Sequence, residues 1–115
     1  MQSEASLRDL FHAQVSALTE PHFLILYWTA QAEGRGLRYN LTNCFDDLKA
    51  AGITRTKQTA VALVESLAAL CFLHLRDAGN RKNLYITSHG ARALETLVLR
   101  ETHTPRPSTF LEATT

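Results

Sequence analysis

The sequence predicts a single, mainly α-helical (α+β) domain in which a β-hairpin follows a set of packed helices. Three observations predict this class. Apolar residues recur at the spacing of amphipathic helices along much of the chain. Residues 71–86 instead alternate apolar and polar side chains on both sides of a turn, as a hairpin does. With 115 residues, of which 45% are hydrophobic, the chain has the size and composition of one ordinary globular domain.

The N-terminal third of the chain carries the signals of two helices. One helical face collects Leu7, Leu10, Phe11, Val15 and Leu18. This spacing predicts an amphipathic helix over residues 6–18. Thr19 can cap a second helix, which is apolar nearly all round over residues 23–28 and ends at Gly34. We therefore expect the second helix at the centre of the core.

A very short connection separates the third and fourth predicted helices. Thr42 is predicted to cap a helix over residues 43–51, which Gly52 terminates. Thr54 is predicted to cap the next helix, which spans residues 55–70. Two helices joined by so few residues, with a glycine in the turn, form a helix-turn-helix unit.

The strands follow the fourth helix. Residues 71–76 alternate apolar and polar side chains, and residues 83–86 return as a second strand. The connecting residues 77–82 contain Gly and Asn, which tolerate turn conformations, together with two cationic side chains. Residues 37–41 are short and extended, which predicts a brief edge strand.

A final amphipathic helix is predicted over residues 88–100, capped by Thr87 or Ser88. From Thr102 the chain is rich in Thr, Pro and Ser and is expected to be disordered. The predicted organisation is thus an N-terminal flanking helix (1–18), a central domain (19–101) and a disordered tail (102–115).

This order of elements resembles a winged helix-turn-helix domain, with a three-helix core, a C-terminal β-hairpin wing and flanking N- and C-terminal helices. The chain is most similar to MarR-type transcriptional regulators. The resemblance rests on the capped helix at Thr54, on Leu70-Cys71-Phe72 before the hairpin, and on the stretch RDAGNRKNLYITSHG with its Thr-x-x-Gly motif. It covers roughly residues 19–100 and implies a regulator that binds double-stranded DNA.

The charge distribution agrees with that implication. The whole chain has a net charge of only +1. Residues 1–54 hold four Lys/Arg against six Asp/Glu, whereas residues 55–100 hold seven against three. Positive charge is therefore concentrated in the part of the chain that contains the fourth helix and the hairpin, as a polyanionic partner would require.

The polar side of helix 55–70 supplies the candidate base-reading residues. Arg and Gln can each make two hydrogen bonds to a base edge, and a small residue allows close approach of the helix. We assign base readout to Arg55, Gln58, Thr59 and Ala62. The same side also carries Glu65, so an ordinary solvated face, or a surface that binds protein, remains an alternative.

The charged hairpin and the start of the helix supply the candidate phosphate contacts. We assign these to Thr54, Thr56, Lys57, Arg76, Asn80, Arg81 and Lys82. Charges on an edge hairpin also discourage strand pairing with other chains, and the two roles are compatible. Arg35 and Arg38 are weaker candidates for the same surface.

The sequence favours neither catalysis nor cofactor binding. Asp46 and Asp47 are adjacent on a helix, so their side chains point about 100° apart and do not form an acid–base pair. Cys71 and His74 have a Cys-x-x-His spacing, but no second ligand pair accompanies them. We expect no catalytic residue, no metal site and no cofactor.

The partners expected from the sequence are DNA and a second copy of the chain. The helices over 6–18 and 88–100 have wide apolar stripes, which either pack on each other and on residues 23–28 within one chain or form a homodimer interface, and we favour the homodimer. The polar start of the chain indicates no secretory signal, so a cytoplasmic protein without a membrane partner is expected. The alternative is a winged-helix module that binds protein without binding DNA, and a small-molecule effector is left open.

Overall fold

The elements predicted from the sequence occur in the predicted order in the computed structural model, which describes residues 4–114. The helices in this range are α1 (Glu4–Ser16), α2 (Glu20–Gly34), α3 (Leu41–Ala50), α4 (Lys57–Ala69), α5 (Ser88–Arg100) and α6 (Thr109–Ala113). The strands are β1 (Tyr39–Asn40), β2 (Leu73–Ala78) and β3 (Arg81–Ile86), which form an antiparallel sheet in the order β1-β3-β2. The mainly α (α+β) winged-helix arrangement is confirmed. Residues 1–3 and 115, at the ends of the predicted flanking segments, lie outside the described residues.

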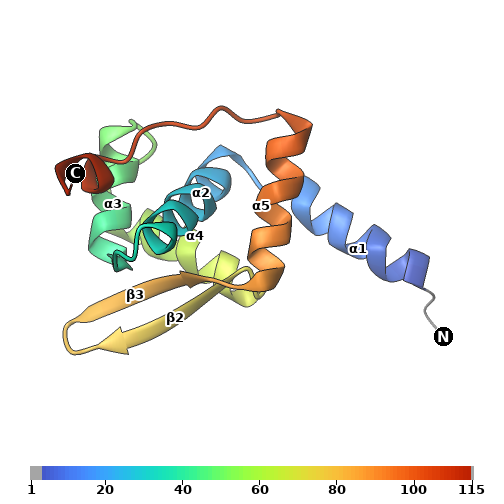
Figure 1. Cartoon of the computed structure of the whole chain (residues 1–115), viewed down its shortest axis with the longest axis horizontal. Helices are drawn as coiled ribbons and strands as arrows, with labels where there is room; N and C mark the ends of the chain where they lie inside the picture. The colour runs from blue at the N-terminus through green and yellow to red at the C-terminus, as the bar shows by residue number, and fades with distance from the viewer. Residues whose placement is uncertain (1–3, 115) are drawn as a thin grey trace.

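The predicted central helix is α2. It lies between α5 and the α3–α4 pair and also contacts β3 (Figure 1). Its apolar side chains Phe23, Leu24, Ile25, Leu26 and Trp28 are completely buried. A helix that is apolar on all sides is stable only when neighbours cover every side, and α2 has neighbours all round. No helix within residues 4–114 has both the length and the apolar character needed to cross a membrane.

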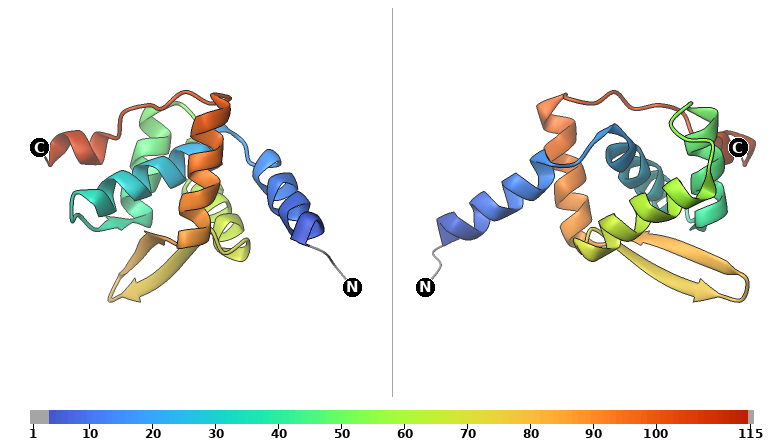
Figure 2. Two further views of the ribbon diagram at one scale, coloured as in Figure 1. Left: turned by 45° about the vertical axis from the view of Figure 1, so that its right-hand side comes forward. Right: turned by 180° about the vertical axis from the view of Figure 1, so that it is seen from behind.

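The two flanking helices pack against each other at one end of the molecule. Figure 2 shows α1 projecting from the body and touching it mainly through α5. The ring of Phe11 on α1 contacts the rings of Phe72 and His89 at centroid distances of 6.5 and 5.2 Å. Arg100 at the end of α5 donates a hydrogen bond of 2.9 Å to Ser16 Oγ.

The hairpin is longer and its turn tighter than predicted. Ala78 pairs with Arg81, so only Gly79 and Asn80 form the loop in place of the predicted six-residue turn. Gly79 has a φ of +65°, and a positive φ at the first of two loop residues suits glycine, which has no Cβ. The predicted residues 77–82 thus mostly continue the two strands.

The Thr-x-x-Gly motif joins the hairpin to α5. Thr87, one of the two predicted caps, begins α5: its hydroxyl accepts a hydrogen bond from the amide of Gly90. The same hydroxyl donates a hydrogen bond to Cys71 O at 2.6 Å. A Cβ on Gly90 would lie 1.9 Å from the carbonyl oxygen of Phe72. Only glycine therefore allows α5 to begin so close to the link between α4 and β2.

The prediction that Thr42 caps the third helix is wrong by two residues. Asn40 caps α3, because its side chain accepts the amide of Asn43 at 2.8 Å. The Asn43 side chain in turn accepts the Asn40 amide at 3.1 Å. This reciprocal pair satisfies two amides at once, as a capping box does, and leaves Thr42 inside the first turn.

The prediction that residues 102–115 are disordered is also wrong for the described part of this segment. Residues 102–108 run back along the molecule and lead into α6, which packs beside α3 (Figures 1 and 2). Ser108 caps α6, and Leu111 is buried. Trp28 on the central helix donates its indole N–H to the carbonyl of Arg106 at 2.8 Å.

A buried carboxylate holds this C-terminal segment in place. Asp47 on α3 is only 1% exposed. Its donors are Tyr39 Oη (2.6 Å), Ser108 Oγ (2.5 Å), Thr109 Oγ1 (2.6 Å) and the amide of Phe110 (3.1 Å). Each carboxylate oxygen thus accepts two hydrogen bonds, which offsets the cost of burying the group. We call Asp47 and these four donors the C-terminal clasp.

Candidate nucleic-acid interface

The start of α4 differs from the prediction. Thr56, not Thr54, caps the helix by accepting the amide of Thr59 at 3.4 Å, with the two hydroxyls 2.8 Å apart. The Thr54 hydroxyl instead accepts the amide of Thr56 at 3.1 Å and so forms the preceding turn. Arg55 consequently precedes the helix, and helical projection does not describe its direction. It is exposed beside the first turn of α4.

The outward side of α4 carries two of the predicted base-reading residues together. Gln58 and Ala62 are exposed and line a shallow hollow of about 420 Å³. The rest of its lining is Lys57, Val61 and Glu65. Thr59 is exposed too, but its hydroxyl contacts the capping Thr56. The structure thus groups Gln58 and Ala62 with Lys57, which the sequence analysis assigned to phosphate contacts.

Ser66, also on α4, has its side chain directed towards α2. Its hydroxyl donates to Leu63 O at 2.8 Å and lies 3.1 Å from Nε2 of His22, which belongs to α2. Burial lowers the pKa of His22 below its ordinary value and favours the neutral imidazole. This contact fixes the inner edge of α4 against α2 and leaves the Gln58–Ala62 side directed outward.

The strand register divides the predicted wing residues between two faces. Side chains alternate along a strand, so Asp77 and its partner Lys82 share one face with Leu75 and Leu84. Arg76 and Arg81 lie on the opposite face. The Arg76 guanidinium lies 5.8 Å from the centre of the Tyr85 ring on that face. The wing is therefore a two-sided element, and its cations do not all reach the same partner.

The face that carries Lys82 lies opposite the start of α4. A hollow of about 240 Å³ separates them. Its lining combines Leu41, Thr42 and Lys57 from the helices with Asp77, Gly79, Asn80, Arg81 and Lys82 from the wing. Lys57 therefore lines both this hollow and the one along α4. We call the two hollows together the α4–wing surface.

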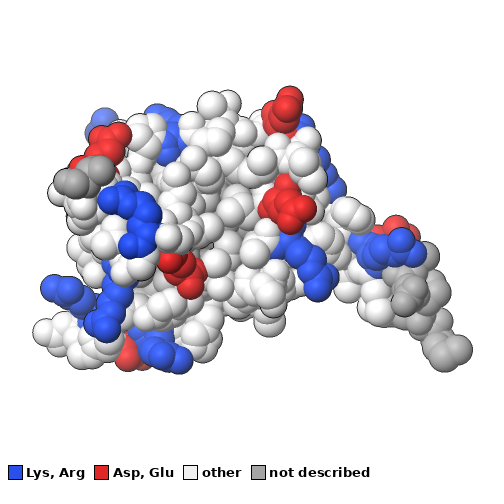
Figure 3. All heavy atoms as spheres, viewed as in Figure 1, with Lys and Arg blue, Asp and Glu red and all other residues white. Residues whose placement is uncertain are grey.

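Lys and Arg side chains gather at the wing end of the molecule, where few acidic side chains interrupt them (Figure 3). Lys57 and Arg81 are exposed, and Lys82 is half-buried. The sequence did not indicate Leu41 or Thr42 as part of this surface, because their position depends on the reciprocal cap at Asn40 and Asn43. In the sequence, this cap is indicated only by the Asn-x-x-Asn spacing of Asn40 and Asn43 at the start of the helix.

The Cys-x-x-His pair offers no metal site. Cys71 is exposed and has a φ of +63°, so it belongs to the turn before β2, and His74 lies on the strand itself. The other cysteine, Cys44, is buried in the core. Within residues 4–114 there is no group of three or more His, Cys, Asp or Glu side chains placed to hold a metal ion.

One solved structure has a similar fold. No protein-family model and no curated protein matches the sequence. The structure is similar to that of BpsR from Bordetella bronchiseptica, a protein whose DNA binding is regulated by 6-hydroxynicotinic acid. The two align with a TM-score of 0.57 over 85% of this chain and 73% of the BpsR chain, at 17% sequence identity. At this identity the likeness shows a shared fold.

Proposed function

We propose that the protein is a DNA-binding transcriptional regulator of the MarR type that acts in the cytoplasm as a homodimer. The observation that carries the proposal is the position of Lys57. It connects the outward side of α4 with the hollow beneath the wing, so one continuous cationic surface combines a helix with a hairpin. A helix of this width fits the major groove, and an adjacent hairpin reaches the flanking backbone. The shared fold with BpsR supports the same function.

Within this surface the residues take two roles. Gln58 and Ala62 face the base edges, where the Gln58 amide can pair with adenine and the small Ala62 allows the helix to approach closely. Arg55 and Thr59 lie beside them at the start of the helix. Lys57, Asn80, Arg81 and Lys82 contact phosphates. Thr54 and Thr56 contribute by holding the turn before α4, and Arg76 contacts a phosphate from the outer face of the wing.

The homodimer forms through α1 and α5. Four large apolar side chains are exposed there: Leu7 (54%), Leu10 (53%), Val98 (46%) and Leu99 (75%). Apolar side chains that gather on two adjoining helices mark a contact surface more often than a solvated one. A two-fold axis through these helices would repeat α4 on the second protomer and allow the dimer to contact two half-sites.

A protein-binding winged helix is the second candidate function. It is favoured by the hollow along α4, because Val61 and Ala62 form an apolar floor there and Glu65 would repel phosphate. An amphipathic helix of a partner would fit such a floor. The two candidates predict opposite salt dependence, since apolar contacts do not weaken as salt is added.

Fluorescence anisotropy with a labelled random-sequence duplex tests the proposal. Three to five phosphate contacts per protomer give a log–log salt slope of about −3 to −4.5. Changing Arg81→Ala and Lys82→Ala together should weaken binding to every sequence alike and flatten the slope by about 2. Lys49→Ala is the matched control, because it removes an exposed cation from the far end of α3. Binding that shows no salt slope, or a double variant that behaves as the control does, would refute DNA binding through this surface.

A further inference from the structure

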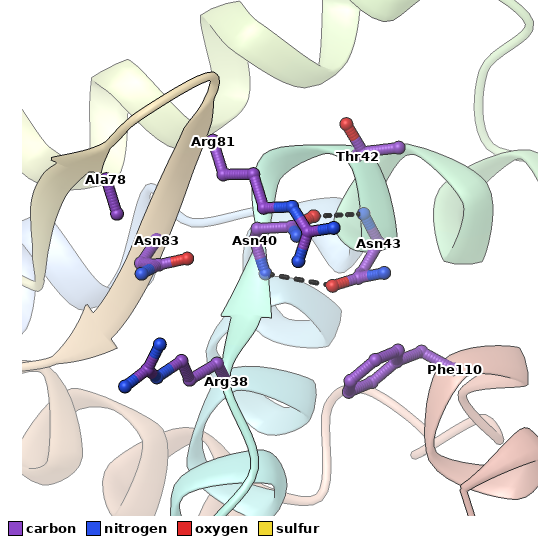
Figure 4. A pocket seen from close by; sticks show the side chains of 8 residues that line it. All are labelled: Arg38, Asn40, Thr42, Asn43, Ala78, Arg81, Asn83 and Phe110. Carbon is purple, nitrogen blue, oxygen red and sulfur yellow. Dashed lines mark hydrogen bonds between the residues drawn. The ribbon is translucent and has the colours of Figure 1, made fainter.

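The hollow along α4 has an apolar floor, which sets it apart from the larger pocket of about 490 Å³ between the β1–β3 edge, the start of α3 and α6. Val61 and Ala62 form this floor. The larger pocket is lined mainly by polar side chains, such as those of Arg38, Asn40 and Arg81 (Figure 4). A surface proposed to bind a polyanion thus contains an apolar patch, which contacts with phosphates do not explain.

The spacing of side chains along α4 produces the hollow. Residues three or four positions apart lie on the same side of a helix, so Gln58, Ala62 and Glu65 form one row. Lys57, Val61 and Glu65 form the row beside it. In each row a short side chain stands between two longer ones, so the longer side chains make the walls. Val61 is half-buried and Ala62 is exposed, and a partner can therefore reach their methyl groups.

Thymine presents an apolar group in the major groove, its C5-methyl, whereas the amino, carbonyl and ring-nitrogen groups of the bases form hydrogen bonds there. A donor or acceptor placed against Val61 and Ala62 would lose water without gaining a partner, which costs free energy. A methyl group in the same place gains free energy, because apolar surface leaves water. We propose that Val61 and Ala62 bind the C5-methyl group of thymine, which makes Val61 a specificity-determining residue of α4. This contact rests on the proposed function, because it lies on the same surface.

The charges around the hollow favour DNA over an apolar partner helix as its occupant. Lys57 lines the hollow and also lines the one beneath the wing, together with Arg81 and Lys82. Cations at this end hold phosphates beside the hollow, and the base edges of the same duplex then face its floor. Glu65 is compatible with this arrangement, because a carboxylate directed at a base edge can accept a hydrogen bond from the amino group of cytosine.

Gln58 and the floor read different base pairs. Gln58 precedes Ala62 by four residues, which is about one helical turn, or roughly 5.4 Å along the axis. Successive base pairs are about 3.4 Å apart. The adenine that pairs with the Gln58 amide and the thymine whose methyl enters the hollow therefore belong to two A·T pairs, about one or two steps apart. We expect such a pair of A·T positions in each half-site that the protein prefers.

Replacement of thymine by deoxyuridine tests the contact, because it removes the C5-methyl group and keeps the base pair. A tightly bound duplex is first selected from a random library with the full-length protein, and its thymines are then replaced one at a time in the anisotropy assay. Burial of one methyl group corresponds to about fourfold tighter binding. We expect a loss of this size at one or two positions in each half-site and no change elsewhere. If every replacement changes the affinity by less than about twofold, the methyl contact is overturned while DNA binding stands. A protein that binds no duplex, as an apolar partner helix in the hollow would require, refutes the proposed function as well.

Variants locate the contact at Val61. Val61→Ala removes both γ-methyl groups, so the ratio of the affinities for thymine and deoxyuridine at the sensitive position should fall below about twofold. The ratio compares two duplexes with one protein sample, and a reduced folded fraction of the variant therefore cancels. Lys49→Ala should keep the wild-type ratio and both affinities. Lys82→Ala should weaken binding to both duplexes equally, because a phosphate contact does not distinguish the bases. A ratio in Val61→Ala that stays at the wild-type value would overturn the assignment of the methyl contact to the floor of the hollow.

Discussion

The C-terminal clasp and the α4–wing surface both contain charged side chains, but their hydrogen-bonding groups are satisfied in opposite ways. In the clasp, the two oxygens of Asp47 accept four hydrogen bonds from within the chain, and the carboxylate is only 1% exposed. At the wing, Arg81 and Lys82 have no hydrogen bond or ion pair within residues 4–114. Polar groups that are satisfied internally stabilise the fold, whereas those left without partners are available to a ligand.

The two regions are close neighbours in the fold. Tyr39 of the clasp pairs with Leu84 across the sheet, next to the pairing of Asn40 with Asn83. The clasp also positions Phe110, which lines a pocket of about 490 Å³ between the β1–β3 edge, the start of α3 and α6. A rigid internal network therefore supports the side of the molecule on which unpaired cations are exposed. Substitutions in the two regions should consequently have separable effects on stability and binding.

Removing the clasp carboxylate should have the largest effect. Asp47→Ala leaves the buried hydroxyls of Tyr39 and Ser108 without their acceptor and releases α6. We expect the free energy of unfolding to fall by about 3–5 kcal/mol, measured by urea denaturation. Asp47→Asn keeps the size and one acceptor oxygen, so its loss should be smaller. A loss below about 1 kcal/mol for Asp47→Ala would show that the clasp does not stabilise the fold.

Two glycines provide a second contrast between occupied and open space. A Cβ on Gly90 would clash with the backbone of Phe72, whereas a Cβ on Gly34 would meet nothing within 4 Å. Gly90→Ala should destabilise the protein by about 2–4 kcal/mol, because backbone atoms must move apart. Gly34→Ala should be neutral or slightly stabilising. Equal thermal midpoints for the two variants would contradict the close approach of α5 to the link before β2.

Tyr39 gives the clasp a pH signature. Burial, the neighbouring Cys44 and the Asp47 carboxylate all raise the pKa of Tyr39 well above its ordinary value of 10.0. Because the folded state holds this proton more tightly, stability is unaffected below the unfolded pKa and falls as pH rises beyond about 10. Tyr39→Phe should lower the free energy of unfolding by about 1 kcal/mol at neutral pH, because one hydrogen bond is lost. Above about pH 10 the free energy of unfolding of this variant should fall less steeply than that of the wild type. An unchanged alkaline slope would argue against ionisation of Tyr39 as its cause.

Most of the fold could be predicted from the sequence because the information is local. The apolar stripes, the Thr19 and Thr87 caps and the strand alternation each involve residues a few positions apart. Even so, the cap of α4 was misplaced, because Thr54, Thr56 and Thr59 follow one another closely and any of them can accept an amide. As a result, Arg55 was predicted to lie in the helix, and the direction of its side chain was predicted incorrectly.

The clasp and the pocket could not be predicted, because their partners are distant in sequence. Ser108 donates to Asp47 across 61 positions, and the composition of residues 102–108 is that of a flexible tail. The same distance hides the pocket, which needs β1 beside β3 and α6 beside α3. The identity of exposed cations is visible in the sequence, but the face of the wing on which each one lies depends on the strand register.

Loss of the wing cations should have the smallest effect on stability. Arg81→Ala together with Lys82→Ala removes two side chains that pair with nothing within residues 4–114. We expect the free energy of unfolding to change by less than about 0.5 kcal/mol, while the proposed DNA binding of the same variant should be weaker. The change should, if anything, be stabilising at low ionic strength, because Arg38 and Lys57 are then relieved of like-charge neighbours, and added salt should remove the gain. A loss as large as that of Asp47→Ala would mean that the wing cations serve the fold, and the contrast between the two regions would fail.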